Sequence, residues 1–143
     1  MTPINTLLEG CKILDAVMKP HGFTFVGGLT GKGSGGYFAS GEYVRGDRRL
    51  ELHFRYSLGL VTYHIGELSL THDEYMRALL GKDGGNKYPN FSDDSLDGFR
   101  GLKFDLEHYC RDFLSGSGEE FRSCVGKAHE REKLSGFKKL SAE

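Results

Sequence analysis

The sequence lacks an excess of charge of either sign. Its 19 lysines and arginines are balanced by 20 aspartates and glutamates, which gives a formal net charge of -1 at pH 7. Proteins that bind nucleic acid usually carry a basic patch, whereas here both signs are interspersed along the chain. We therefore expect no nucleic-acid partner.

Long apolar runs and cysteine motifs are also missing. No stretch reaches the roughly 18 apolar residues of a transmembrane helix, and the N-terminus does not show the basic, apolar and small-residue order of a signal peptide. The three cysteines, Cys11, Cys110 and Cys124, form no CxxC motif. Cys11 and Cys110 fall on the apolar faces of predicted helices. These features predict reduced, buried thiols in a cytoplasmic protein without membrane contact.

Glycine is abundant, but the nucleotide-binding motifs that use it are absent. The segment Gly27–Gly36 contains a literal G-x-G-x-x-G at Gly31, Gly33 and Gly36. A Rossmann fingerprint opens a helix, whereas the residues that follow alternate like a strand. The other motifs of a kinase and the spacing of a P-loop are both missing. We expect a flexible connection between strands, or alternatively a loop that contacts a ligand or partner.

What the sequence does contain is strict alternation between Arg48 and Gly66. Apolar side chains occupy every second position: Leu50, Leu52, Phe54 and Tyr56, then Val61, Tyr63 and Ile65. A period of two predicts strands with one buried face and one solvated face. The interruption at Leu58-Gly59 predicts a tight hairpin loop, since glycine adopts positive φ without steric cost.

Two turns set the predicted register. The Leu58-Gly59 loop pairs Leu52 with Ile65 and Phe54 with Tyr63. A second turn at Gly46-Asp47, with glycine first as type II′ prefers, places the preceding apolar residues on the same face. The result is a four-stranded antiparallel meander with these strands: Phe23–Val26, Tyr37–Arg45, Arg48–Ser57 and Leu60–Gly66.

Helical periodicity flanks the sheet. Thr2 and Pro3 open a helix that ends at Pro20, and Thr71-x-x-Glu74 is a capping box. Further helices are predicted over Asp94–Leu114 and Glu119–Arg131. We expect an α+β fold in one domain over residues 1–131, with the N-terminal helix and two to three C-terminal helices packed on one sheet face. Residues 132–143 are predicted to be a loosely attached or disordered tail.

The polar face of the predicted sheet holds the candidate binding residues. The predicted register places His53 opposite both Ser40 and His64, Glu42 opposite Glu51, and Arg55 opposite Thr62. We expect a non-enzymatic protein-binding module that presents this face, without a metal or cofactor. Its candidate binding residues are Glu42, Glu51, His53, Arg55 and His64.

An enzyme is the alternative interpretation of the same face. Two cross-strand histidines with carboxylates nearby suit a small metal-dependent or hydrolytic enzyme centred on His53 and His64. No H-E-x-x-H spacing and no nucleophile elbow accompanies them, so we assign no catalytic and no metal-binding residue.

The order of the elements resembles small bacterial α-β-β-β-β-α proteins of unknown function, some of which are immunity proteins of toxin systems. The segments that carry the resemblance are LDAVMKPHGFTF (14–25), GEYVRGDRR (41–49) and residues 50–64. The resemblance covers the first half of the chain. It implies an inhibitory protein partner and no catalysis, and it identifies no functional residue. The sequence leaves the oligomeric state open, and a homodimer through an exposed edge strand is compatible with it.

Overall fold

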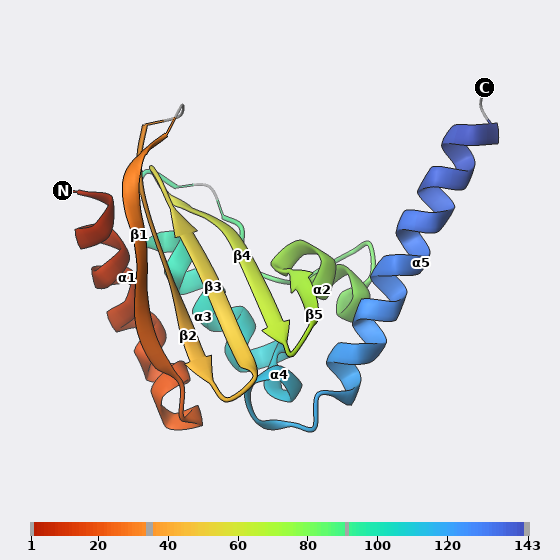
Figure 1. The fold of residues 1–143 in the computed structure, drawn as a ribbon, viewed down its shortest axis with the longest axis horizontal. Coiled ribbons are helices and arrows are strands. Elements are labelled where there is room, and N and C mark those ends of the chain that lie inside the picture. Colours follow the sequence, from red (N-terminus) through yellow and green to blue (C-terminus); the bar gives the residue numbers. More distant parts are fainter. Residues whose placement is uncertain (1, 34–35, 91, 142–143) are drawn as a thin grey trace.

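The computed structural model describes residues 2–33, 36–90 and 92–141, with the backbone alone over 133–141. Figure 1 shows one antiparallel sheet with helices packed behind it and α5 extending past β5. The elements in chain order are α1 (Pro3–Met18), the 3-10 helix η1 (Lys19–His21), β1 (Thr24–Gly33), β2 (Gly36–Arg45), β3 (Arg48–Phe54), β4 (Leu58–Ile65), β5 (Leu68–Thr71), α2 (His72–Leu80), α3 (Asp97–Tyr109), α4 (Arg111–Ser115) and α5 (Glu119–Ser141). The α+β class and the antiparallel sheet are confirmed, but the described strands number five, in the order β1-β2-β3-β4-β5.

The first helix begins where its sequence predicts and ends at Met18, two residues before the predicted end at Pro20, which lies in η1. The Thr2 hydroxyl accepts a hydrogen bond from the backbone N–H of Asn5 at 3.3 Å, and Pro3 occupies the first helical turn. After η1, Gly22 adopts a left-handed conformation with φ of 84° and turns the chain toward β1. The helix buries Leu7, Cys11, Leu14, Val17 and Met18.

The hairpin between β2 and β3 has the predicted register. Tyr43 lies opposite Leu50, and Ala39 lies opposite Phe54. Gly46 has φ of 58°, and no described non-glycine residue has positive φ, so the turn has glycine in the position that type II′ requires. Ala39, Tyr43, Leu50 and Leu52 are fully buried on the inner face, and Phe54 stacks on Phe99 of α3 at 6.0 Å between ring centres.

The hairpin between β3 and β4 differs from the prediction. Leu52 lies opposite Val61 rather than Ile65, and Phe54 lies opposite Leu58 rather than Tyr63. The loop is therefore Arg55–Ser57, and the predicted Leu58-Gly59 turn is wrong.

The error has a physical reason. The partner of Leu52 is displaced by four residues, from Ile65 to Val61. Any even slip keeps every side chain on its face, so a period of two excludes only odd slips. The structure also contains a bulge at this point, because the register shifts between Leu52 and Phe54. His53 thus faces both Gly59 and Leu60, and the extra residue turns Leu58 into the core, where it is 5% exposed.

The first strand is longer than predicted. β1 pairs with β2 from Thr24 to Gly33, so most of the segment predicted to be a flexible connection belongs to the sheet. Ser34 and Gly35 of that segment lie outside the described residues. Glycines carry no side chain that could show a period of two, yet their backbone groups pair with β2 like any others. A bulge between Gly27 and Thr30 interrupts the pairing.

The strand β5 was missed altogether. Gly66, with φ of 59°, turns the chain back along β4, and four residues from Leu68 to Thr71 complete the sheet. The edges are therefore β1 and β5, and the predicted edge at Leu60–Gly66 is wrong.

The helical half follows the prediction in part. The capping box at Thr71 and Glu74 is present, with both reciprocal hydrogen bonds at 3.2 and 2.9 Å. The single helix predicted over Asp94–Leu114 is divided at Cys110 into α3 and α4. Helix α5 continues to Ser141, beyond the predicted end at Arg131. The statement that residues 132–143 are loosely attached or disordered stays a prediction. No helix in the described part of the chain combines the length and apolar character that crossing a membrane requires.

Candidate functional site

Four of the predicted binding residues lie on the outer face of the sheet, which the helices leave uncovered. As predicted, Glu42 lies opposite Glu51. His64, however, lies opposite Arg49 and not opposite His53, because the β3–β4 register differs. Glu42, His53 and His64 are half-buried, and Glu51 is exposed. We call the surface formed by Glu42, Glu51, His53 and His64 the polar sheet face.

The charges of the polar sheet face are paired with one another. Arg49 Nη1 lies 3.1 Å from a carboxylate oxygen of Glu42, and His64 Nε2 lies 2.8 Å from a carboxylate oxygen of Glu51. The His53 ring stacks on Phe38 with 5.5 Å between ring centres. A face whose charged groups already compensate one another offers little net attraction to a charged partner.

Ser40 lies opposite His53 as predicted, but the pairing of two histidines that motivated the enzyme alternative is absent from the structure. His53 and His64 are not cross-strand partners. The Ser40 hydroxyl lies near the backbone of Leu29, 3.2 Å from its nitrogen and 3.4 Å from its oxygen. Within residues 2–33, 36–90 and 92–141, no group of three or more histidine, cysteine, aspartate or glutamate side chains is placed to hold a metal ion.

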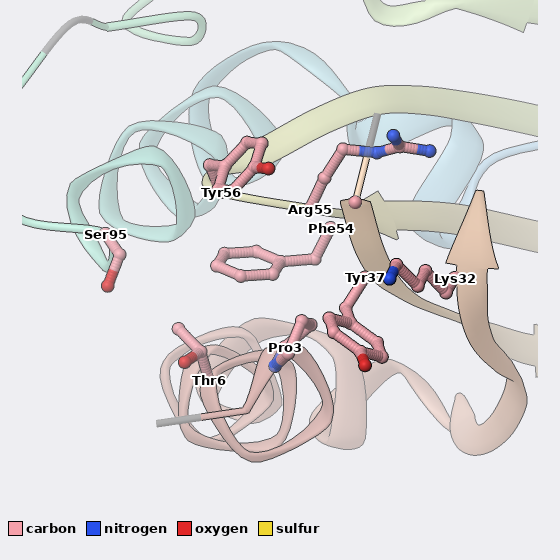
Figure 2. A pocket seen from close by; sticks show the side chains of 9 residues that line it. Pro3, Thr6, Lys32, Tyr37, Phe54, Arg55, Tyr56 and Ser95 are labelled. Atoms are coloured by element: carbon pink, nitrogen blue, oxygen red, sulfur yellow. The ribbon is translucent and has the colours of Figure 1, made fainter. Parts of the chain in front are cut away.

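The fifth predicted residue, Arg55, lies in a groove at one end of the sheet (Figure 2). The groove has a volume of about 480 Å³ and lies between the first turns of α1, the hairpin of β1 and β2, the end of β3 and the segment before α3. Its lining residues are Pro3, Thr6, Lys32, Gly36, Tyr37, Phe54, Arg55, Tyr56 and Ser95.

The walls of the groove carry exposed aromatic rings. Tyr37 is 62% exposed and Tyr56 is 77% exposed, whereas Phe54 is only 3% exposed. Figure 2 shows the Phe54 side chain between Tyr56 on one side and the first turns of α1 on the other. Large aromatic side chains at such exposure are typical of surfaces that bind another molecule.

The groove is also positively charged. None of the described lining residues is acidic, and neither Lys32 nor Arg55 takes part in any of the ion pairs among the described side chains. Lys32 Nζ lies 5.5 Å from the centre of the Tyr37 ring, and the Arg55 guanidinium carbon lies 5.9 Å from the centre of the Phe38 ring. The first turn of α1 adds the positive end of a helix dipole, since Pro3 is in the lining.

The glycines of the literal G-x-G-x-x-G allow side chains to lie close to the hairpin backbone. A Cβ atom added to Gly33 would lie 3.3 Å from Arg55 Nη2, and one added to Gly36 would lie 2.5 Å from the Tyr56 hydroxyl. Gly36 also has φ of 107°, which disfavours any other residue. Gly33 and Gly36 thus leave room for Arg55 and Tyr56, and Gly31 leaves room for the Phe38 ring at 3.2 Å.

A buried polar cluster joins the sheet to the helices. Asp105 of α3 is fully buried and accepts hydrogen bonds from the backbone N–H groups of Lys87 at 2.7 Å and Tyr88 at 2.8 Å. His72 Nε2 lies 2.9 Å from Asp105, and His72 Nδ1 lies 2.8 Å from the Tyr63 hydroxyl.

The chemistry of these side chains determines the direction of each hydrogen bond in the cluster. Burial raises the pKa of the Tyr63 hydroxyl well above its ordinary value, so Tyr63 stays protonated and donates to His72 Nδ1. His72 then donates from Nε2 to Asp105, and the Cys110 thiol donates to the Tyr63 oxygen at 3.6 Å. Every member has a partner, and Asp105 and His72 are 0% and 3% exposed. We therefore assign the cluster a structural role.

Our sequence interpretation missed this cluster, although the sequence carries a signal for it. Asp105 falls on the apolar stripe of its predicted helix, beside Leu102 and Leu106. A carboxylate in such a position needs buried donors. His72, by contrast, stands in a capping turn among acidic residues and gives no sign of burial.

Comparison of the chain with protein-family models, with curated proteins and with solved structures found no match.

Proposed function

We propose that the protein is a non-enzymatic binding module that engages another protein at the groove and at the adjoining polar sheet face. The observation that carries this proposal is the combination of Lys32 and Arg55, which lack ion-pair partners among the described residues, with the exposed rings of Tyr37 and Tyr56. Tyrosine and arginine are enriched among the residues that dominate binding energy at protein interfaces.

The two surfaces have different roles in this proposal. Arg55 and Tyr56 belong to the short loop between β3 and β4, so they stand at the border between groove and sheet face. The groove supplies the anchoring contacts. The polar sheet face, with its internally paired charges, surrounds them as a polar rim, where a single ion pair contributes about 0–1 kcal/mol.

The resemblance to immunity proteins gives this proposal one specific partner, which is a toxin whose activity is inhibited when this protein binds it. A cytoplasmic location fits that role and stays a prediction. No geometric observation favours the enzyme alternative centred on His53 and His64.

Site-specific photo-crosslinking in the host cell tests the proposal. A photoreactive amino acid replaces Tyr56 in one variant and Lys12 of α1, which is exposed and outside the groove, in the control. We expect a discrete crosslinked protein from position 56 and none from position 12. The crosslink should disappear when Arg55→Ala is added, with the circular dichroism spectrum unchanged.

Two results would contradict the proposal. One is a crosslinked partner that is unaffected by Arg55→Ala. The other is the same crosslinks from positions 12 and 56, which would indicate nonspecific capture.

A further inference from the structure

We infer that the groove binds an extended protein segment in which glutamate or aspartate residues alternate with apolar residues. This inference rests on the proposed function and specifies the chemistry of the partner. It commits to a peptide segment, as opposed to a nucleotide, a free anion or a nucleic acid.

The charge of the groove selects carboxylates. Lys32 comes from β1 and Arg55 from the loop between β3 and β4 (Figure 2), and no described acidic residue is in the lining with them. An arginine fork binds a carboxylate with two parallel hydrogen bonds, and the first turn of α1 favours negative charge nearby.

The aromatic rings of the groove favour a partner segment that has apolar side chains between its carboxylates. Tyr37 and Tyr56 are more than half exposed, and Pro3 and the largely buried Phe54 also line the groove. A volume of about 480 Å³ falls within the usual range of about 300–1,000 Å³ for ligand sites, which suits a few side chains of an extended segment.

The geometry of the glycines argues against a phosphate ligand. Phosphate-binding glycine loops present free backbone N–H groups. Here Arg55 Nη2 lies 3.3 Å from the Cβ position of Gly33, the Tyr56 hydroxyl lies 2.5 Å from that of Gly36, and the backbone of Gly33 pairs with that of Gly36 in the β1–β2 ladder. The net charge of -1 also provides no extended basic field for nucleic acid.

Fluorescence anisotropy with the full-length chain tests the inference. The probe is a fluorescein-labelled peptide of alternating glutamate and leucine, and its counterpart has glutamine in place of glutamate. Lys32→Glu and Arg55→Glu reverse the two charges of the groove. The matched control is Arg122→Glu, an exposed residue of α5 with the same change in net charge.

We expect the glutamate peptide to bind at least about tenfold more tightly than the glutamine peptide, which corresponds to one charged hydrogen bond. Each groove reversal should weaken its binding by about tenfold or more, and Arg122→Glu by less than about twofold. Binding should also weaken near 1 M salt, where the Debye length is about 3 Å. Lys32→Gln and Arg55→Gln should give intermediate losses, and they replace any reversal variant whose circular dichroism shows loss of fold.

Three outcomes would overturn the inference. Equal binding of the two peptides would exclude selection of carboxylates. Equal losses in the groove and control variants would exclude the groove as the site. Competition by inorganic phosphate at a concentration similar to that of the peptide would identify a general anion site. If a partner crosslinks at position 56 while the peptides fail these tests, the inference fails and the proposed function stands. If the peptides behave as expected and no partner crosslinks, the proposed function fails alone.

Discussion

Nε2 of His72 lies 2.9 Å from Oδ2 of Asp105, and both side chains are buried although they are 33 residues apart in the sequence. The pair connects the start of α2 to the middle of α3. Through Tyr63 it also reaches β4, so three parts of the fold depend on one carboxylate.

Replacement of Asp105 with alanine is therefore expected to be strongly destabilising. Asp105→Ala leaves His72 Nε2 and the N–H groups of Lys87 and Tyr88 buried without their acceptor. Unfolding in urea should show a loss of about 3–5 kcal/mol. Tyr63→Phe removes a single hydroxyl from the same cluster, and its loss should be about 1–2 kcal/mol. A loss below about 1 kcal/mol for Asp105→Ala would contradict the structural role assigned to the cluster.

Two adjacent arginines at the start of β3 should differ in their contribution to stability. Arg48 donates to the carbonyl oxygens of Asp112 at 2.9 Å, Phe113 at 2.7 Å and Gly116 at 2.5 Å, and so completes the end of α4. Arg49 pairs with a glutamate on the polar sheet face. We expect Arg48→Met to lower the free energy of unfolding by about 1.5–3 kcal/mol. Arg49→Met should lower it by about 0–1 kcal/mol. Equal losses in a denaturant titration would show that Arg48 does not secure α4.

Glycine-to-alanine substitutions in two helices should have opposite effects. A Cβ atom at Gly10 of α1 would lie 2.4 Å from the fully buried ring of Phe99 in α3. Gly10→Ala should therefore destabilise the fold by about 1–3 kcal/mol through overpacking. Gly126 of α5 has no atom within 4 Å of such a Cβ, so Gly126→Ala should stabilise the helix by about 0.5–1 kcal/mol. Thermal melts of the two variants measure this difference. A melting temperature that rises for Gly10→Ala would refute the close approach of α1 to α3.

Engineered cysteine pairs distinguish the observed register of β3 and β4 from the one the sequence predicts. Glu51 lies opposite Thr62 in the structure. Directly opposed residues have Cα atoms about 4.5–5.5 Å apart, which a disulfide spans. The Glu51→Cys, Thr62→Cys protein should form an intramolecular disulfide under mild oxidation, measured by intact mass. The His53→Cys, His64→Cys protein tests the predicted register and should stay reduced. The native cysteines are buried and should not interfere. A disulfide in the His53→Cys, His64→Cys protein and none in the Glu51→Cys, Thr62→Cys protein would support the predicted register instead.

The sequence by itself determined the features that depend on a few neighbouring residues. Thr71 and Glu74 cap α2 because both groups of the box lie within one turn of chain. Gly46 predicts the turn between β2 and β3 because positive φ favours glycine, and the short loop then sets that register. The alternation around Leu52 identifies the buried face because side chains of a strand alternate between its two sides.

Only the tertiary structure decided the features that depend on distant partners. A period of two does not distinguish registers that differ by an even number of residues, here four, so packing and the bulge opposite His53 decide how β3 pairs with β4. That register separates His53 from His64 and places Arg55 in the loop at the border between the groove and the polar sheet face. The burial of His72 likewise depends on Asp105, which local sequence does not bring near it. The groove exists because four segments that are distant in sequence meet at one end of the sheet, and no local pattern encodes such a meeting.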